Sequence, residues 1–177
     1  WVPSGTRWRR SSSPPAWLVP VVRVVSDTHV FPTTGLVLGP GRVLVPSAFT
    51  ADGAPLVVLD GGPDLARDGR SAEVLQSLPL AGLALLDVPG LERPAPVLAD
   101  RPLPDGGELA LAAFSPADRI RAGEPFVFRR GSVTVDDAGI VEITAARPLP
   151  NLTGALVDAC GYWVGYSAAR GVASLST

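Results

Sequence analysis

Residues 35–49 read GLVLGPGRVLVPSAF, the clearest strand-forming pattern in the chain. Two short runs of apolar and β-branched residues, 34–38 and 42–45, flank the segment Gly39-Pro40-Gly41. Two strand-forming runs joined by a glycine-containing turn are typical of a β-hairpin. We therefore predict an antiparallel hairpin over residues 34–45.

Similar short runs recur on both sides of this hairpin, and none carries a sustained 3.6-residue apolar period. The 19 glycines and 19 prolines divide the chain into short pieces, which favours strands over long helices. A chain of many short, closely spaced strands is typical of a sandwich or of barrels. The further strands that we predict are residues 17–25, 56–59, 71–75, 83–88, 109–114, 126–128, 131–135, 140–144, 155–157 and 162–166.

Five prolines fall within residues 89–104, which predicts a connector between two lobes. We expect an all-β protein of two six-stranded β-barrels packed side by side, the first over residues 17–97 and the second over 98–177. Residues 1–16, WVPSGTRWRRSSSPPA, have no apolar period and are predicted to form an extended N-terminal arm.

Composition excludes several classes of function. The chain has 177 residues and a formal net charge of −2, so no basic field favours nucleic acid. One cysteine, Cys160, and one histidine, His29, exclude an internal disulfide and any site that needs two such ligands. We expect no metal and no cofactor. No apolar run reaches the roughly 20 residues of a spanning helix, so membrane association would need a partner or an upstream anchor.

Tryptophan and arginine, the residue types that anchor many protein interfaces, are concentrated in the arm. We expect a protein partner, in a multi-subunit assembly, to bind here. The alternative that the arm packs on the protein's own surface stays open. The arm residues expected to contact a partner are Trp1, Arg7, Trp8, Arg9 and Arg10.

Three stretches in order resemble the trypsin-like serine proteases of the HtrA type. Residues 35–49 resemble the hairpin that ends in the catalytic histidine, and 82–88 (GLALLDV) resemble the strand led by the catalytic aspartate. Residues 143–167 (ITAARPLPNLTGALVDACGYWVGYS) are similar to the segment of the nucleophilic serine. The resemblance implies a chymotrypsin-like fold of two barrels.

The residues at the catalytic positions of this family are replaced. The histidine position falls on Ala48, the aspartate position on Gly82 and the nucleophile on Leu152. Acyl transfer of this kind needs a hydroxyl, a base and a group that orients the base, and these side chains supply none of them. One oxyanion-hole amide falls on Pro150, which has no N–H. The resemblance therefore implies a pseudoprotease, not an active enzyme.

We expect a non-catalytic binding or scaffolding subunit of a larger assembly. One alternative is a peptide-binding chaperone or sensor that uses the old substrate cleft. Another is an active hydrolase with a relocated nucleophile at Ser47 or Thr153, although a hydroxyl without a base is a poor nucleophile. The resemblance also implies a periplasmic or otherwise extracytoplasmic location.

The remaining candidate residues favour structural roles. Asp60, Asp64 and Asp68 lack the alternating spacing of a calcium loop and are predicted to lie in a solvated loop. We expect His29 to be a surface or hydrogen-bonded histidine. Cys160 has no electropositive neighbours in sequence and is expected to be an inert thiol.

Overall fold

The computed structural model describes residues 14–27, 29–62, 64–100, 106–114, 126–135, 141–144, 153–158, 161–167 and 173–175. These residues fall into two compact units. One is built on Ala16–Ala95, and the other on Pro96–Ala113 and Phe126–Thr177.

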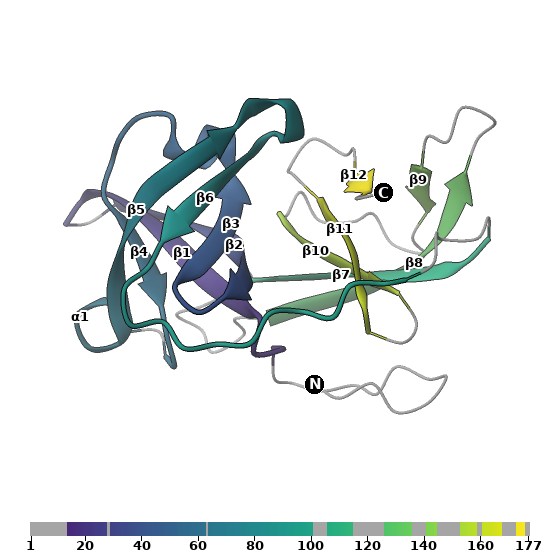
Figure 1. The fold of residues 1–177 in the computed structure, drawn as a ribbon, viewed down its shortest axis with the longest axis horizontal. Helices are drawn as coiled ribbons and strands as arrows, with labels where there is room; N and C mark the ends of the chain where they lie inside the picture. Colours follow the sequence, from purple (N-terminus) through teal and green to yellow (C-terminus); the bar gives the residue numbers. More distant parts are fainter. Residues whose placement is uncertain are drawn as a thin grey trace. The chain divides into compact units, whose positions relative to one another are not determined.

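The first unit is a closed six-stranded barrel with the strand order β1-β2-β3-β6-β5-β4 (Figure 1). The predicted hairpin is β2–β3, in which Leu36 pairs with Leu44 and Val37 with Val43. The expectation of an all-β chain that contains a six-stranded barrel is confirmed. The strands are β1 (Leu18–Ser26), β2 (His29–Gly39), β3 (Arg42–Pro46), β4 (Leu56–Leu59), β5 (Gly69–Leu78) and β6 (Leu83–Asp87), joined in part by the short helices η1 (Ser47–Thr50), α1 (Leu65–Asp68) and η2 (Pro79–Ala81).

Valines that alternate along the strands fill the barrel. Val19 and Val21 on β1 and Val43 and Val45 on β3 are completely buried, because every second residue of a strand points inward. Gly35 on β2 lies between these strands. A Cβ atom built on Gly35 would lie 2.6 Å from Val21 Cγ2 and 2.6 Å from Val43 Cγ1, so the barrel core leaves no room for a side chain there.

Several strands are longer than the sequence predicts. β2 begins at His29 rather than at residue 34, and β5 runs from Gly69 to Leu78 rather than over 71–75. Pro20 lies inside β1 opposite Thr34 of β2, whereas the pairing of β1 with β4 covers only Val21 to Arg23. No described strand pairs with Pro20 on the β4 side of β1. The missing N–H of the proline therefore costs no hydrogen bond of the sheet on that side.

The described parts of the second unit form a six-stranded sheet with the order β12-β11-β10-β7-β8-β9. Residues 126–128 and 131–135 were expected as two strands but belong to one, because the chain continues extended through Gly131. Closure of this sheet into a second barrel stays a prediction. The strands are β7 (Glu108–Phe114), β8 (Phe126–Val135), β9 (Val141–Thr144), β10 (Gly154–Asp158), β11 (Trp163–Ser167) and β12 (Ala173–Leu175).

Candidate functional site

Ala48, the position expected for a catalytic histidine, lies in the short helix η1 directly after β3. Pro46 is extended, with φ −61° and ψ 137°, and turns the chain from the strand into the helix. Phe49 is half-buried and packs on the barrel core, while Ala48 is exposed. The local sequence therefore anchors η1 through its aromatic side chain and presents the Ala48 position to solvent.

Gly82, the position expected for a catalytic aspartate, ends the turn between β5 and β6. It adopts the left-handed conformation, with φ 66° and ψ 22°, and its amide donates to the carbonyl of Pro79 at 3.2 Å. The carbonyl of Gly82 in turn accepts a 2.9 Å hydrogen bond from the amide of Ser47. The structure therefore brings the chain next to Ala48 into direct contact with Gly82.

The two segments that meet at this junction carry only uncharged side chains. The segments PSAFT at residues 46–50 and LPLAGL at 78–83 contain no acidic or basic side chain. Thr50 Oγ1 donates to the carbonyl of Ser47 at 2.9 Å, which closes the turn of η1. Ser47 and Thr50 are thus the hydroxyl-bearing residues of these two segments, and neither segment supplies a base.

Arg23 of β1 contacts the aromatic ring that anchors η1, a role that was not predicted from the sequence. Its guanidinium carbon lies 5.0 Å from the ring centroid of Phe31 and 5.4 Å from that of Phe49. Arg23 Nη1 also forms an ion pair with Asp52 Oδ2 at 3.2 Å, and the buried Nε has no hydrogen-bond partner among the described residues. A single arginine inside the apolar run WLVPVVRVV was the available signal.

The second half of the predicted site is described only in part. Leu152 and Pro150, expected at the nucleophile and the oxyanion hole, lie outside the described residues. Thr153, the alternative nucleophile, is half-buried immediately before β10. Gly154 follows in close contact with β7, since a Cβ atom there would lie 2.7 Å from Ala113 Cβ.

The residues expected to bind a partner, Trp1, Arg7, Trp8, Arg9 and Arg10, lie outside the described residues, as does Cys160. The chain is described from Pro14 onward, and Pro15 is buried. Arg93 Nη1 donates to the carbonyl of Ala16 at 3.2 Å, so the chain is held where it enters the barrel.

His29 lies at the turn between β1 and β2. Its Nδ1 atom is 3.2 Å from Ser26 Oγ, which also accepts a hydrogen bond from the His29 amide. The histidine is exposed and bonded to its own turn, as a structural role requires.

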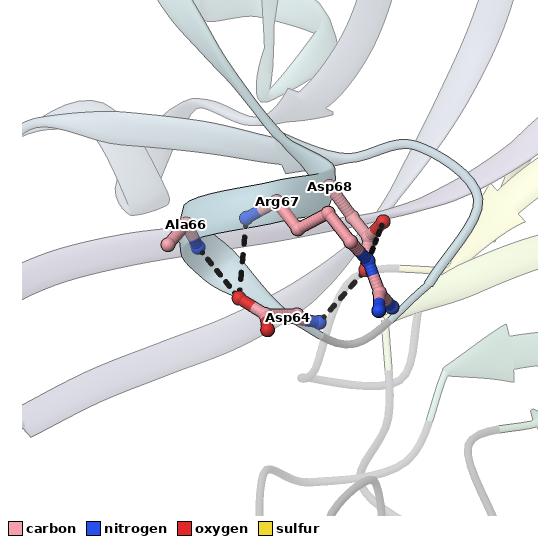
Figure 2. A network of polar contacts seen from close by, with 4 residues as sticks. All are labelled: Asp64, Ala66, Arg67 and Asp68. Carbon is pink, nitrogen blue, oxygen red and sulfur yellow. Dashed lines mark hydrogen bonds and ion pairs between the residues drawn. The ribbon is translucent and has the colours of Figure 1, made fainter.

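The acidic loop before β5 is more ordered than the predicted solvated loop. Asp64 Oδ1 accepts hydrogen bonds from the amides of Ala66 and Arg67 at 2.9 and 3.1 Å and so caps the one-turn helix α1 (Figure 2). Asp68 Oδ2 accepts from the Asp64 amide at 3.0 Å, and the Asp68 carboxylate also pairs with Arg67. Hydrogen bonds from Arg67 hold the pKa of Asp68 below its usual value.

Asp60, at the start of this loop, forms a charge cluster with two arginines. Its carboxylate accepts from Arg70 Nε at 2.7 Å and from Arg93 Nε at 2.8 Å. Burial raises the pKa of Asp60, but the hydrogen bonds and charges of the two arginines outweigh it and lower the pKa. Across the described ranges, no three histidine, cysteine or acidic side chains gather as a metal site would require. The helices in those ranges are also too short or too polar to span a membrane.

No protein-family model matches the sequence, and no curated protein matches it significantly. Solved structures match the fold. The active form of the Rv3671c protease from M. tuberculosis aligns with a TM-score of 0.67 and 19% identity over 92% of this chain and 76% of that one. Its inactive form aligns with a TM-score of 0.67 and 20% identity over 91% and 84%.

A serine endoprotease from Yersinia pestis aligns with a TM-score of 0.66 and 18% identity, over 88% of this chain and 54% of that one. Similarity at this level of identity shows a shared fold only. The reaction that a protein of this fold can perform depends on the side chains present at its site. Together with the closed barrel and the order of its strands, these alignments show that the chain has the trypsin-like fold.

Proposed function

We propose that this chain is a non-catalytic domain of the trypsin-like, HtrA type that acts as a binding or scaffolding subunit of a larger assembly. The observation that carries the proposal is the hydrogen bond between Ser47 and Gly82. It joins the two chain segments in which this fold would hold its base and the group that orients the base. Neither segment has a side chain that takes or holds a proton near neutral pH.

The second-unit positions support the same conclusion from sequence. Leucine at position 152 has no nucleophilic atom, and proline at 150 removes an amide that would stabilise an oxyanion. Loss of one oxyanion donor typically raises the barrier by about 2.7–4 kcal/mol. Peptide hydrolysis by the mechanism of this fold needs a nucleophile, a base and an acid that orients the base. All three are replaced in this chain, so we expect no hydrolysis by that mechanism.

The test of lost catalysis is covalent labelling of the 177-residue chain with a broad fluorophosphonate probe, with an active serine protease as the positive control. We expect no labelled peptide in the digest. Labelling at Ser47 or Thr153 would identify a relocated nucleophile and overturn the proposal. The variants Ser47→Ala and Thr153→Val provide the matched controls, because each removes one hydroxyl.

We place the partner contact in the N-terminal arm, since Trp1, Trp8 and the neighbouring arginines have the side chains that dominate binding energies at interfaces. The truncation should remove residues 1–13 only, because Pro15 is buried and the carbonyl of Ala16 is bound by Arg93. Loss of co-purifying subunits with an unchanged melting temperature is expected. Unchanged association would exclude the arm as the docking segment.

The resemblance to the HtrA type supports a location of this subunit outside the cytoplasm, with any contact to a membrane made through the partner. Fractionation of cells that express the tagged natural protein tests this location. Recovery with the cytoplasmic fraction alone would contradict it.

A further inference from the structure

The second half of β5 has an open backbone edge. The residues from Gly69 to Ala72 pair with β4 on one side, whereas those from Glu73 to Leu78 pair with β6 alone. In the described part of the chain, no strand and no further backbone hydrogen bond reaches the other side of this segment. This stretch of β5, about six residues and roughly 20 Å long, is therefore unpaired on its β4 side.

The side chains of this edge are exposed on both faces. In the first half of β5 Ala72 points into the core, but the next five residues are all exposed. Val74 is 46% and Leu75 is 53% exposed. The register shift between Val74 and Gln76 leaves Leu75 without a partner on β6, and such a bulge re-aims the side chain. In Figure 1 the far ends of β5 and β6, with their turn, extend past the neighbouring strands.

The edge also lacks the features by which strands avoid pairing with other chains. Exposed edges usually carry lysine, proline or several charges. The segment EVLQSL at residues 73–78 contains one charge, Glu73, and no proline. An exposed apolar edge without such protection is suited to accept an added strand, and its free N–H and C=O groups supply the affinity.

We propose that the edge formed by residues 73–78 binds an extended, apolar segment of a partner protein that carries a basic residue next to Glu73. The added segment continues the sheet beyond β5, with its apolar side chains against Val74 and Leu75. This surface goes beyond the proposed function, because it depends neither on the arm nor on the loss of catalysis.

Size and charge favour a partner peptide over a second copy of this chain. A stable protein dimer needs about 800 Å² of buried surface from each partner. An edge of six residues is the length of a short peptide strand and falls short of that area. A second copy that paired its own edge would also bring another Glu73 carboxylate and no lysine or arginine from residues 73–78. A peptide with one arginine complements the edge instead.

The probe is a fluorescein-labelled heptapeptide of alternating valine and threonine with one arginine, titrated with the 177-residue chain by fluorescence anisotropy. Two further peptides are N-methylated at alternate positions, one at the odd residues and one at the even residues. Because an added strand hydrogen-bonds through every second residue, one methylated peptide should bind like the parent and the other should lose binding. Equal binding of all three, or no binding at about 1 mM, overturns the proposal.

Leu75→Lys is the test variant and Val25→Lys is its matched control. Val25 is about as exposed as Leu75, at 54%, but it lies on β1, which β4 separates from β5. Leu75→Lys should weaken binding at least about fivefold, and Val25→Lys should leave it unchanged. A further peptide carries glutamate in place of the arginine. The unsubstituted chain should prefer the arginine peptide, and Glu73→Arg should prefer the glutamate peptide. Equal loss in both lysine variants overturns the assignment. If the chain forms a dimer in solution and Leu75→Lys makes it monomeric, the edge binds a second copy of the chain, and the proposal of a partner peptide is overturned.

Discussion

The backbone amide of Ser47 donates a 2.9 Å hydrogen bond to the carbonyl oxygen of Gly82. This contact joins the start of η1 to the turn that precedes β6, and it continues the pairing of β3 with β6, in which Pro46 is opposite Leu83. Two positions 34 residues apart in the sequence, Ala48 and Gly82, are thereby brought to one end of the barrel. That end holds backbone polar groups and hydroxyls but no titratable side chain from either segment.

If Ala48 and Gly82 occupy the positions of a base and its orienting acid, an introduced pair should interact. We expect the imidazole of an Ala48→His/Gly82→Asp variant to have a pKa about one unit above that of Ala48→His alone, because a nearby carboxylate stabilises the imidazolium. Aspartate tolerates the left-handed backbone of Gly82 better than most residues.

Titration by NMR measures this pKa in a His29→Gln background, which removes the natural histidine signal. The Ala48→His/Gly82→Asn variant is the neutral control. Identical titration with aspartate and with asparagine would show that the two side chains do not meet.

Arg23 should contribute to stability through both its aromatic neighbours and its ion pair. We expect Arg23→Met to lower the free energy of unfolding by about 1–2 kcal/mol, because the methionine keeps part of the packing but loses the cation between Phe31 and Phe49. Asp52→Asn should cost less than about 1 kcal/mol, since Asp52 is half-exposed. Urea denaturation measures both values, and an equal cost would mean that the ion pair dominates.

The Asp60 cluster should make stability depend on pH in the acid range. The pKa of Asp60 is lowered in the folded protein, so its contribution is complete above its unfolded value of 3.8 and is lost as the pH falls through the folded value. Asp60→Asn should cost about 1–2 kcal/mol at pH 7. The difference between wild type and variant should shrink in acid, and a gap that stays constant down to pH 2 would contradict the assignment.

Asp64 should stabilise its loop as a helix cap and not as a metal ligand. We expect Asp64→Ala to lower the free energy of unfolding by about 1 kcal/mol and Asp64→Asn to cost less, because asparagine also accepts from the helix amides. Addition of millimolar calcium should leave the melting temperature unchanged, since hydrogen bonds already engage the carboxylates of Asp64 and Asp68. A calcium-dependent rise in melting temperature would argue for a metal loop.

Gly35 should be sensitive to the smallest side chain. Gly35→Ala places a methyl group 2.6 Å from Val21 Cγ2 and Val43 Cγ1, which we expect to cost about 1–3 kcal/mol. Val43→Ala leaves a void on its own but makes room for the added methyl. The double variant should therefore be more stable than the sum of the two single costs predicts, and strict additivity would mean that the clash is relieved elsewhere.

The β2–β3 hairpin was predictable because its information is local. Alternating apolar residues on either side of a glycine turn allow few arrangements other than an antiparallel pair with one buried face. The ends of β2 and β5 were not predictable, because the residues around His29 and Leu78 are extended only through pairing with β1 and β6. The same holds for Arg23, whose aromatic neighbours come from β2 and η1.

The strand-rich composition, the first hairpin and the single histidine and cysteine follow from residue type and near neighbours alone, so they could be recognised without the fold. Which distant segments meet became clear from the folded barrel. Closure of the barrel places Ser47 against Gly82 and Asp60 between Arg70 and Arg93. It also leaves residues 73–78 of β5 unpaired on the side away from β6, because β4 is shorter than β5. Such relations depend on the register between strands that are far apart in the sequence, which no local pattern specifies.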